Sequence, residues 1–224
     1  LTAALVVGMT LPAFAQDWFI ENGDITISAG ENGNNVTQGS TTKENDTDTV
    51  IKSNGSSTAS SNTVTIDAGE GKTVDVTLEN VNIDASSGAA VSVTGKGDTN
   101  IELNGNNTLT SGSGHAGLEH NKTEDSGTLT ITDNNNDGKL TANGGVDGAG
   151  IGGSDEHDGQ VTITGGEITA TGGNGAAGIG GGAGDTDAVG GDGDVTISGG
   201  TITATGGRLG AGIGGGAYGN GTVT

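Results

Sequence analysis

The chain has 224 residues, a formal net charge of -21, 48 glycines and no cysteine. Apolar residues make up 29% of the sequence and aromatic residues 2%, well below the apolar share of an ordinary compact domain. The strong negative charge argues against nucleic acid, anionic lipid and acidic polysaccharide as partners, because like charges repel. Without cysteine there is no disulfide framework and no thiol nucleophile.

Residues 1–15 have the pattern of the end of a secretory signal peptide. An apolar run is followed by Pro12 and by the small-x-small sequence Ala-Phe-Ala that ends at Ala15. The run is too short to span a bilayer, and the alternative is a buried N-terminal strand or helix. We therefore expect a mature chain that starts at Gln16, is secreted or held at the cell surface, and does not insert into the membrane in this region.

Residues 16–75 are predicted to form an N-terminal cap and irregular first coils. Short apolar strand patterns occur at 25–27, 50–51 and 64–66, and polar tracts rich in Ser, Thr, Asn and Asp separate them. The only tryptophan, Trp18, has two interpretations. It covers the first hydrophobic layer of a repeat array, or it is a ligand-binding residue that stacks on a sugar ring.

Residues 76–224 are predicted to form regular coils, because apolar residues recur in three groups per repeat of about 28 residues. The first strands are expected at Val76, Ile101, Leu129, Val161, Val195 and Val223. The second strands are expected at Ile83, Leu109, Leu140, Ile168 and Ile202, and the third at Val91, Leu118, Ile151, Ile179 and Ile213. Three short strands per coil, with insertions confined to turns, predict an all-β parallel β-helix. The last coil is expected to be truncated at Thr224.

Strict alternation assigns side chains to an inner and an outer face. Val161 and Ile163 are expected to point into the coil, as is Ile179 on the third strand. The third strand carries Gly180 and Gly214 on its outer side. The third face is therefore predicted to be bare, and a ligand, a backbone or a neighbouring sheet is expected to pack there.

Asp133, Asn135 and Asp137 have the spacing of the first half of a calcium loop, D-x-N-x-D-G. The closing acid is missing, because Gly144 occupies its position, so a ligand from the next coil would have to replace it. The alternative is a turn that uses Asn, Asp and Gly for positive φ angles. A second run at 190–194 starts like the calcium-binding nonapeptide but lacks its acid, and is predicted to be a turn. Calcium is thus the candidate cofactor.

Two successive coils carry the sequence Thr-x-Thr in their second strand, with both threonines expected on the outer side, and we call each such pair a threonine rung. The hydroxyls of these rungs are candidate ligands for a glycan: Thr169, Thr171, Thr203 and Thr205. A regular, flat threonine array is also what a surface for binding ice needs. The expected register places residues such as Gly112 in the same columns, so the array is predicted to break and ice binding is not favoured.

No catalytic constellation stands out. His115, Glu119 and His120 could hold zinc, but the i, i+5 spacing places the two histidines on opposite sides of a strand. Only seven Lys and Arg residues are present, too few and too scattered for the proton abstraction of a polysaccharide lyase. Acidic pairs for glycoside hydrolysis remain an alternative. The sequence therefore predicts a protein that is not an enzyme.

The segments ITATGG and GAGIGGG, with VTLENVNIDASSGAAVSVTGKGDTNIELNGNNTL and HAGLEHN upstream, resemble a family of secreted bacterial, glycine-rich, right-handed β-helix proteins. These are labelled carbohydrate-binding domain-containing proteins, and the resemblance covers roughly residues 18–224. It implies an extracellular, non-catalytic glycan-binding module with a fold like that of polysaccharide lyases, and it makes calcium a candidate cofactor. The alternative is a passive stalk or adhesin segment of a larger surface protein.

Overall fold

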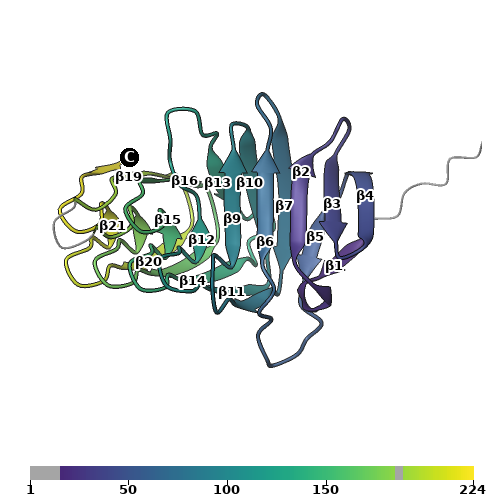
Figure 1. The fold of residues 1–224 in the computed structure, drawn as a ribbon, viewed down its shortest axis with the longest axis horizontal. Coiled ribbons are helices and arrows are strands. Elements are labelled where there is room, and N and C mark those ends of the chain that lie inside the picture. The colour runs from purple at the N-terminus through teal and green to yellow at the C-terminus, as the bar shows by residue number, and fades with distance from the viewer. Residues whose placement is uncertain (1–15, 185–188) are drawn as a thin grey trace, which may run out of the picture.

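The computed structural model describes residues 16–184 and 189–224, so the predicted signal peptide at 1–15 lies outside the described residues. The described chain winds into a parallel β-helix with coils of about 30 residues. Successive coils stack along one axis from the N-terminal to the C-terminal end (Figure 1). The predicted all-β solenoid with three short strands per coil is confirmed.

Three sheets run along the axis, and we number them in the order in which a coil visits them. The first sheet contains, in hydrogen-bonded order, β1 (Asp17–Phe19), β5 (Val50–Lys52), β7 (Thr73–Glu79), β10 (Asp98–Asn104), β13 (Leu129–Thr132), β16 (Gly159–Ile163), β19 (Gly193–Ile197) and β22 (Gly221–Val223). The second sheet contains β8 (Asn82–Asp84), β11 (Asn106–Thr110), β14 (Lys139–Asn143), β17 (Glu167–Thr171) and β20 (Thr201–Thr205).

The third sheet contains β4 (Thr41–Asp46), β3 (Asn34–Gln38), β2 (Ile25–Ala29), β6 (Val64–Ala68), β9 (Val91–Gly95), β12 (Leu118–Glu119), β15 (Ile151–Gly152), β18 (Ile179–Gly180) and β21 (Ile213–Gly214). A short 3-10 helix spans Ile20–Asn22. Parallel pairing already includes β6 and β7, so regular coils begin within the segment that the sequence assigns to the cap.

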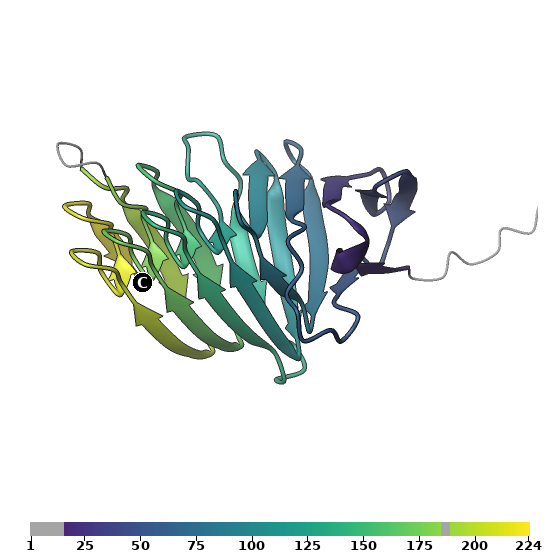
Figure 2. The same cartoon turned by 60° about the horizontal axis from the view of Figure 1, so that its bottom comes forward.

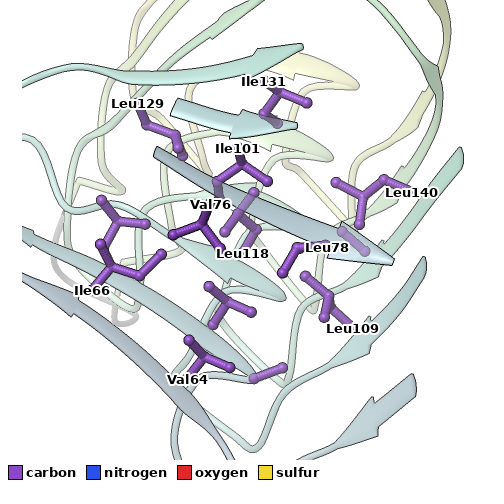
Figure 3. Packing of buried hydrophobic residues seen from close by; sticks show 14 of the residues in the cluster. Val64, Ile66, Val76, Leu78, Ile101, Leu109, Leu118, Leu129, Ile131 and Leu140 are labelled. Carbon is purple, nitrogen blue, oxygen red and sulfur yellow. The ribbon is translucent and has the colours of Figure 1, made fainter. Parts of the chain in front are cut away.

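The hydrophobic core is the interior of the coil, where Val, Ile and Leu side chains from the three sheets meet (Figure 3). Alternation produces this core directly: in β7, Val74, Val76 and Leu78 are buried while their neighbours are exposed or half-buried. Each coil adds a layer of the same kind, so a chain with few apolar residues still forms a continuous core.

The N-terminal end of the solenoid is closed by an antiparallel arrangement of strands within the segment predicted to be a cap. Strands β2, β3 and β4 form an antiparallel meander at the end of the third sheet. The Trp18 side chain is 1% exposed, and its indole Nε1 donates a hydrogen bond to Asp46 Oδ2 at 3.0 Å. The ring is therefore not available to stack on a sugar, which corrects the ligand-binding assignment of Trp18 in favour of the capping interpretation.

The register between coils differs from the predicted one by two residues in two places. In the first sheet Ile101 pairs with Ile131 rather than with Leu129. In the second sheet Leu109 pairs with Ala142 rather than with Leu140. The third-strand column from Val91 to Ile213 is confirmed as predicted.

Both shifts arise because a polar residue occupies an inward position. Thr99 pairs with Leu129 and is fully buried, and Asn107 pairs with Leu140 and is 2% exposed. The Asn107 amide lies at a corner of the coil, where its oxygen accepts a hydrogen bond from the Val81 backbone nitrogen at 2.9 Å. A shift of two residues leaves every apolar side chain on the inner face, so alternation alone does not detect it.

The third face is not bare, which corrects the prediction for its glycines. Gly152, Gly180 and Gly214 are buried and have φ angles of 126°, 133° and 129°. A Cβ built on Gly180 would lie 1.9 Å from the Gly214 carbonyl oxygen and 3.2 Å from the Cα of Gly193. Gly152 and Gly180 thus accommodate the backbone of the next described coil rather than an external partner.

Candidate functional site

An open groove of about 400 Å³ lies on the outer face of the first sheet. Its floor is formed by outward side chains of β7, β10 and β13, and residues 47–49 and Asn134 complete its lining. The polar side chains that line it include Asp48, Asp75, Asn100, Glu102, Thr132 and Asn134. These side chains come from different coils, and stacking brings them together.

Hydrogen bonds between coils hold the groove in one arrangement. Asn100 Nδ2 donates to Asp75 Oδ1 at 2.8 Å. Glu102 accepts from the Asn134 backbone nitrogen at 2.7 Å, from Asn134 Nδ2 at 2.8 Å and from the Thr132 hydroxyl. These contacts fix the floor before any ligand arrives, which reduces the entropy lost on binding.

The groove is negatively charged. Three carboxylates line it, from Asp48, Asp75 and Glu102, and none of the described residues that line it is Lys or Arg. The nearby Lys52 forms ion pairs with Asp17 at 3.2 Å and with Glu79 at 3.3 Å. Such a surface repels uronates and phosphates and accepts hydrogen bonds from neutral hydroxyls or from cations.

No sequence pattern predicts this groove, because no motif connects Glu102 to Asp75 or Asn100. The usable signal was that Asp75 and Asn100 occupy outward positions on adjacent coils, where they pair directly. Asp48 comes from a turn, so only the folded chain places it beside the sheet.

The predicted calcium loop forms the turn between β13 and β14. Asp133 and Asp137 line a second pocket of about 320 Å³, together with Asn136 and Glu167, whereas Asn135 does not. The Asp137 backbone nitrogen donates to Asp133 Oδ1 at 3.2 Å. Among the described residues, no group of three or more His, Asp or Glu side chains is placed to hold a metal ion. The structure thus brings two of the three predicted ligands to one pocket.

The predicted threonine rungs lie side by side on the second sheet. Thr169 pairs with Thr203, and Thr171 pairs with Thr205. The corrected register extends both columns toward the N-terminal end, because Thr108 pairs with Thr141. The interruption expected at Gly112 is therefore wrong.

His115, Glu119 and His120 do not converge on one point. His115 Nδ1 lies 2.8 Å from Glu119 Oε2, whereas the His120 side chain is 2% exposed, with Nδ1 2.8 Å from the Gln160 carbonyl oxygen. Burial lowers the pKa of His120 below its ordinary value of 6.5. His115 thus contacts Glu119, whereas His120 is buried against the backbone of Gln160.

The glycine-aspartate run at 190–194 takes part in links between coils. The Asp192 backbone nitrogen donates to Asp158 Oδ1 at 2.7 Å, and Asp192 Oδ1 accepts from the Asn220 backbone nitrogen at 2.6 Å. Asp194 pairs with Lys122 at 2.8 Å. Gly193 and Asp194 are the first residues of β19, which corrects the prediction that the whole run is a turn. The nearby acids at 185 and 187 lie outside the described residues.

The comparison with family models finds the beta helix repeat at residues 135–155, 161–183 and 195–217. These three matches fall on successive coils of the C-terminal half, and they agree with the parallel β-helix seen in the structure. No curated protein and no solved structure matches the chain. Within residues 16–184 and 189–224, no helix has the length and apolar character needed to cross a membrane.

Proposed function

We propose that this chain is an exported, non-catalytic module that binds neutral polysaccharide or cell-surface glycan in the groove of the first sheet. The observation that carries the proposal is an open groove on a fixed sheet, lined by hydroxyls, amides and carboxylates without a cation. Sugar hydroxyls donate to carboxylates and accept from amide nitrogens, so this lining suits them. Export rests on the signal-peptide pattern of residues 1–15.

The contacts in the groove support binding rather than hydrolysis. Glycoside hydrolysis requires one carboxyl group that gives a proton to the leaving oxygen. The oxygens of Glu102 already accept hydrogen bonds from Thr132 and Asn134, and Asp75 accepts one from Asn100. Both carboxylates are thus used as acceptors that order the sheet.

In this proposal, calcium binds in the second pocket, beside the groove. Asn134 lines the groove, and the adjacent Asp133 lines the second pocket with Asp137. A calcium ion held by these two carboxylates would lie next to the bound glycan, where its remaining ligand positions could accept sugar hydroxyls.

The second candidate function is a passive stalk or adhesin segment. It is favoured by the uninterrupted parallel pairing of the last coils, where β14, β17 and β20 stack without a register shift. A solenoid of this kind spaces other domains apart without binding anything itself.

Retention on insoluble glycans separates the two functions. We expect the wild type to be retained on at least one neutral polysaccharide and not on polyuronates, and Asn100→Ala to weaken retention by at least tenfold. Thr196→Ala is the matched control, because Thr196 lies outward on the same sheet but outside the groove. No retention across a broad panel would leave the stalk as the better account.

A further inference from the structure

The outer face of the second sheet carries two adjacent columns of uncharged hydroxyl and amide side chains, which we name the threonine array. Its members are Thr108, Thr110, Thr141, Asn143, Thr169, Thr171, Thr203 and Thr205. Seven of the eight are threonine, in a chain that carries 28 acidic residues. The array covers four consecutive coils, whose strands lie side by side along the axis (Figure 2).

Within the described residues, six of the seven threonine hydroxyls of the array have no hydrogen-bond partner in the protein. Within the described chain, Thr141, Thr169 and Thr203 have no side-chain hydrogen bond, and one internal contact joins Asn143 Nδ2 to Thr110 Oγ1 at 3.2 Å. Threonine by itself is a common residue on exposed strands, so its presence alone carries no function.

The first sheet differs from the second in how its outward threonines are used. In one of its two columns of outward residues, threonine hydroxyls form hydrogen bonds within the protein. The Thr164 hydroxyl donates to the Ile131 carbonyl oxygen at 3.1 Å, and the Thr132 hydroxyl donates to Glu102. Among the described coils, two adjacent columns with free hydroxyls therefore distinguish the second sheet from the first.

The spacing of the array is regular in both directions. Pairing between β11, β14, β17 and β20 proceeds residue by residue without a shift. Neighbouring coils therefore repeat about every 4.8 Å, and members of one rung repeat about every 6.6 Å along the strand. Water molecules bonded to hydroxyls that repeat in two dimensions are themselves arranged as a repeating layer.

We propose that the threonine array binds the surface of ice. Each threonine offers a hydroxyl that anchors a water molecule and a methyl group that restricts its neighbours, and the stacked coils hold these groups in a fixed lattice. Over these four coils the array is uncharged, as a surface that joins a neutral water lattice should be. Asp84 of β8 continues the column of Thr110, and the Lys139–Glu167 ion pair lies beside the array on the same strands.

The proposal predicts thermal hysteresis, a gap between the melting and freezing points of ice in the protein solution. We expect the full chain without residues 1–15 to show this gap and to shape ice crystals into facets. Thr169→Lys places a long charged side chain in the middle of the array and should abolish both effects. Thr162→Lys is the matched control, since Thr162 is equally half-buried and faces outward on the first sheet.

Circular dichroism and the melting temperature of each variant show whether it is folded. The proposal is overturned if the wild type shows neither hysteresis nor shaped crystals. It is also overturned if folded Thr169→Lys keeps the activity. Binding to crystalline polysaccharide that Thr169→Lys removes, without any effect on ice, would assign the array to a glycan. Neither result affects the groove, which Asn100→Ala tests separately.

Discussion

Replacing Gly180 tests whether the third face is closed by the chain's own backbone. Gly180 has a φ of 133°, and a Cβ there would lie 1.9 Å from the Gly214 carbonyl oxygen. That oxygen accepts a hydrogen bond from the Gly181 backbone nitrogen at 3.0 Å, so it cannot move without disturbing the next coil. Gly180→Ala therefore combines backbone strain with overpacking.

The two contributions can be estimated separately. A residue other than glycine in this backbone region costs about 1–3 kcal/mol, and overpacking a closely packed interior costs about 1–3 kcal/mol. We expect Gly180→Ala to lower the free energy of unfolding by about 2–6 kcal/mol, a large part of the roughly 5–15 kcal/mol of a typical domain.

Two matched glycines isolate each contribution. Gly23 has a φ of 134° and no atom within 4 Å of a built Cβ, so Gly23→Ala measures backbone strain alone, about 1–3 kcal/mol. Gly191 lacks a positive φ, but its Cβ would lie 1.8 Å from the His157 carbonyl oxygen, so Gly191→Ala measures overpacking. Urea unfolding followed by circular dichroism gives all three values. If Gly180→Ala destabilised no more than Gly23→Ala, the third face would be open rather than closed by the backbone of the next coil.

Three further predictions concern the cap, a buried histidine and calcium. Asp46→Ala should lower the free energy of unfolding by about 1–3 kcal/mol, because the Trp18 indole loses its buried acceptor; fluorescence of the only tryptophan reports the unfolding, and an unchanged midpoint would contradict the capping role. Stability should fall as the pH drops below about 6.5, because the unfolded chain binds a proton at His120 that the buried ring resists; His120→Gln should flatten this part of the pH profile, and an identical profile would refute the assignment. Calcium at about 100 times its Kd should stabilise the wild type by about 2.7 kcal/mol, and the double variant Asp133→Asn/Asp137→Asn should not respond; an equal response in both would place calcium elsewhere.

The fold class could be predicted from the sequence because each coil repeats the same alternation. Val161 and Ile163 point inward as expected, and the third-strand column from Val91 to Ile213 stacks as predicted. Alternation has a period of two, so it fixes the face of a side chain but not its partner in the next coil. Thr99 and Asn107 point inward although they are polar, so a pattern of apolar residues does not identify them as inner positions. Both register errors follow from this.

The groove and the threonine array could not be predicted for related reasons. Both depend on which residues of successive coils are neighbours, and the array looked interrupted because of the shifted register. Asp48 reaches the groove from a turn whose path the sequence does not specify. Alternation predicts an open face at the outward glycines of the third strand, because it does not reveal that Gly193 of the next coil passes over Gly180.

A calorimetric titration with a neutral polysaccharide that retains the protein tests whether the groove binds glycan. We expect saturable binding by the wild type and by Thr196→Ala, and binding weakened at least tenfold by Asn100→Ala, whose side chain lies in the groove floor. Equal affinity of all three proteins would show that the glycan binds elsewhere, and the groove of the first sheet would then not be the functional site.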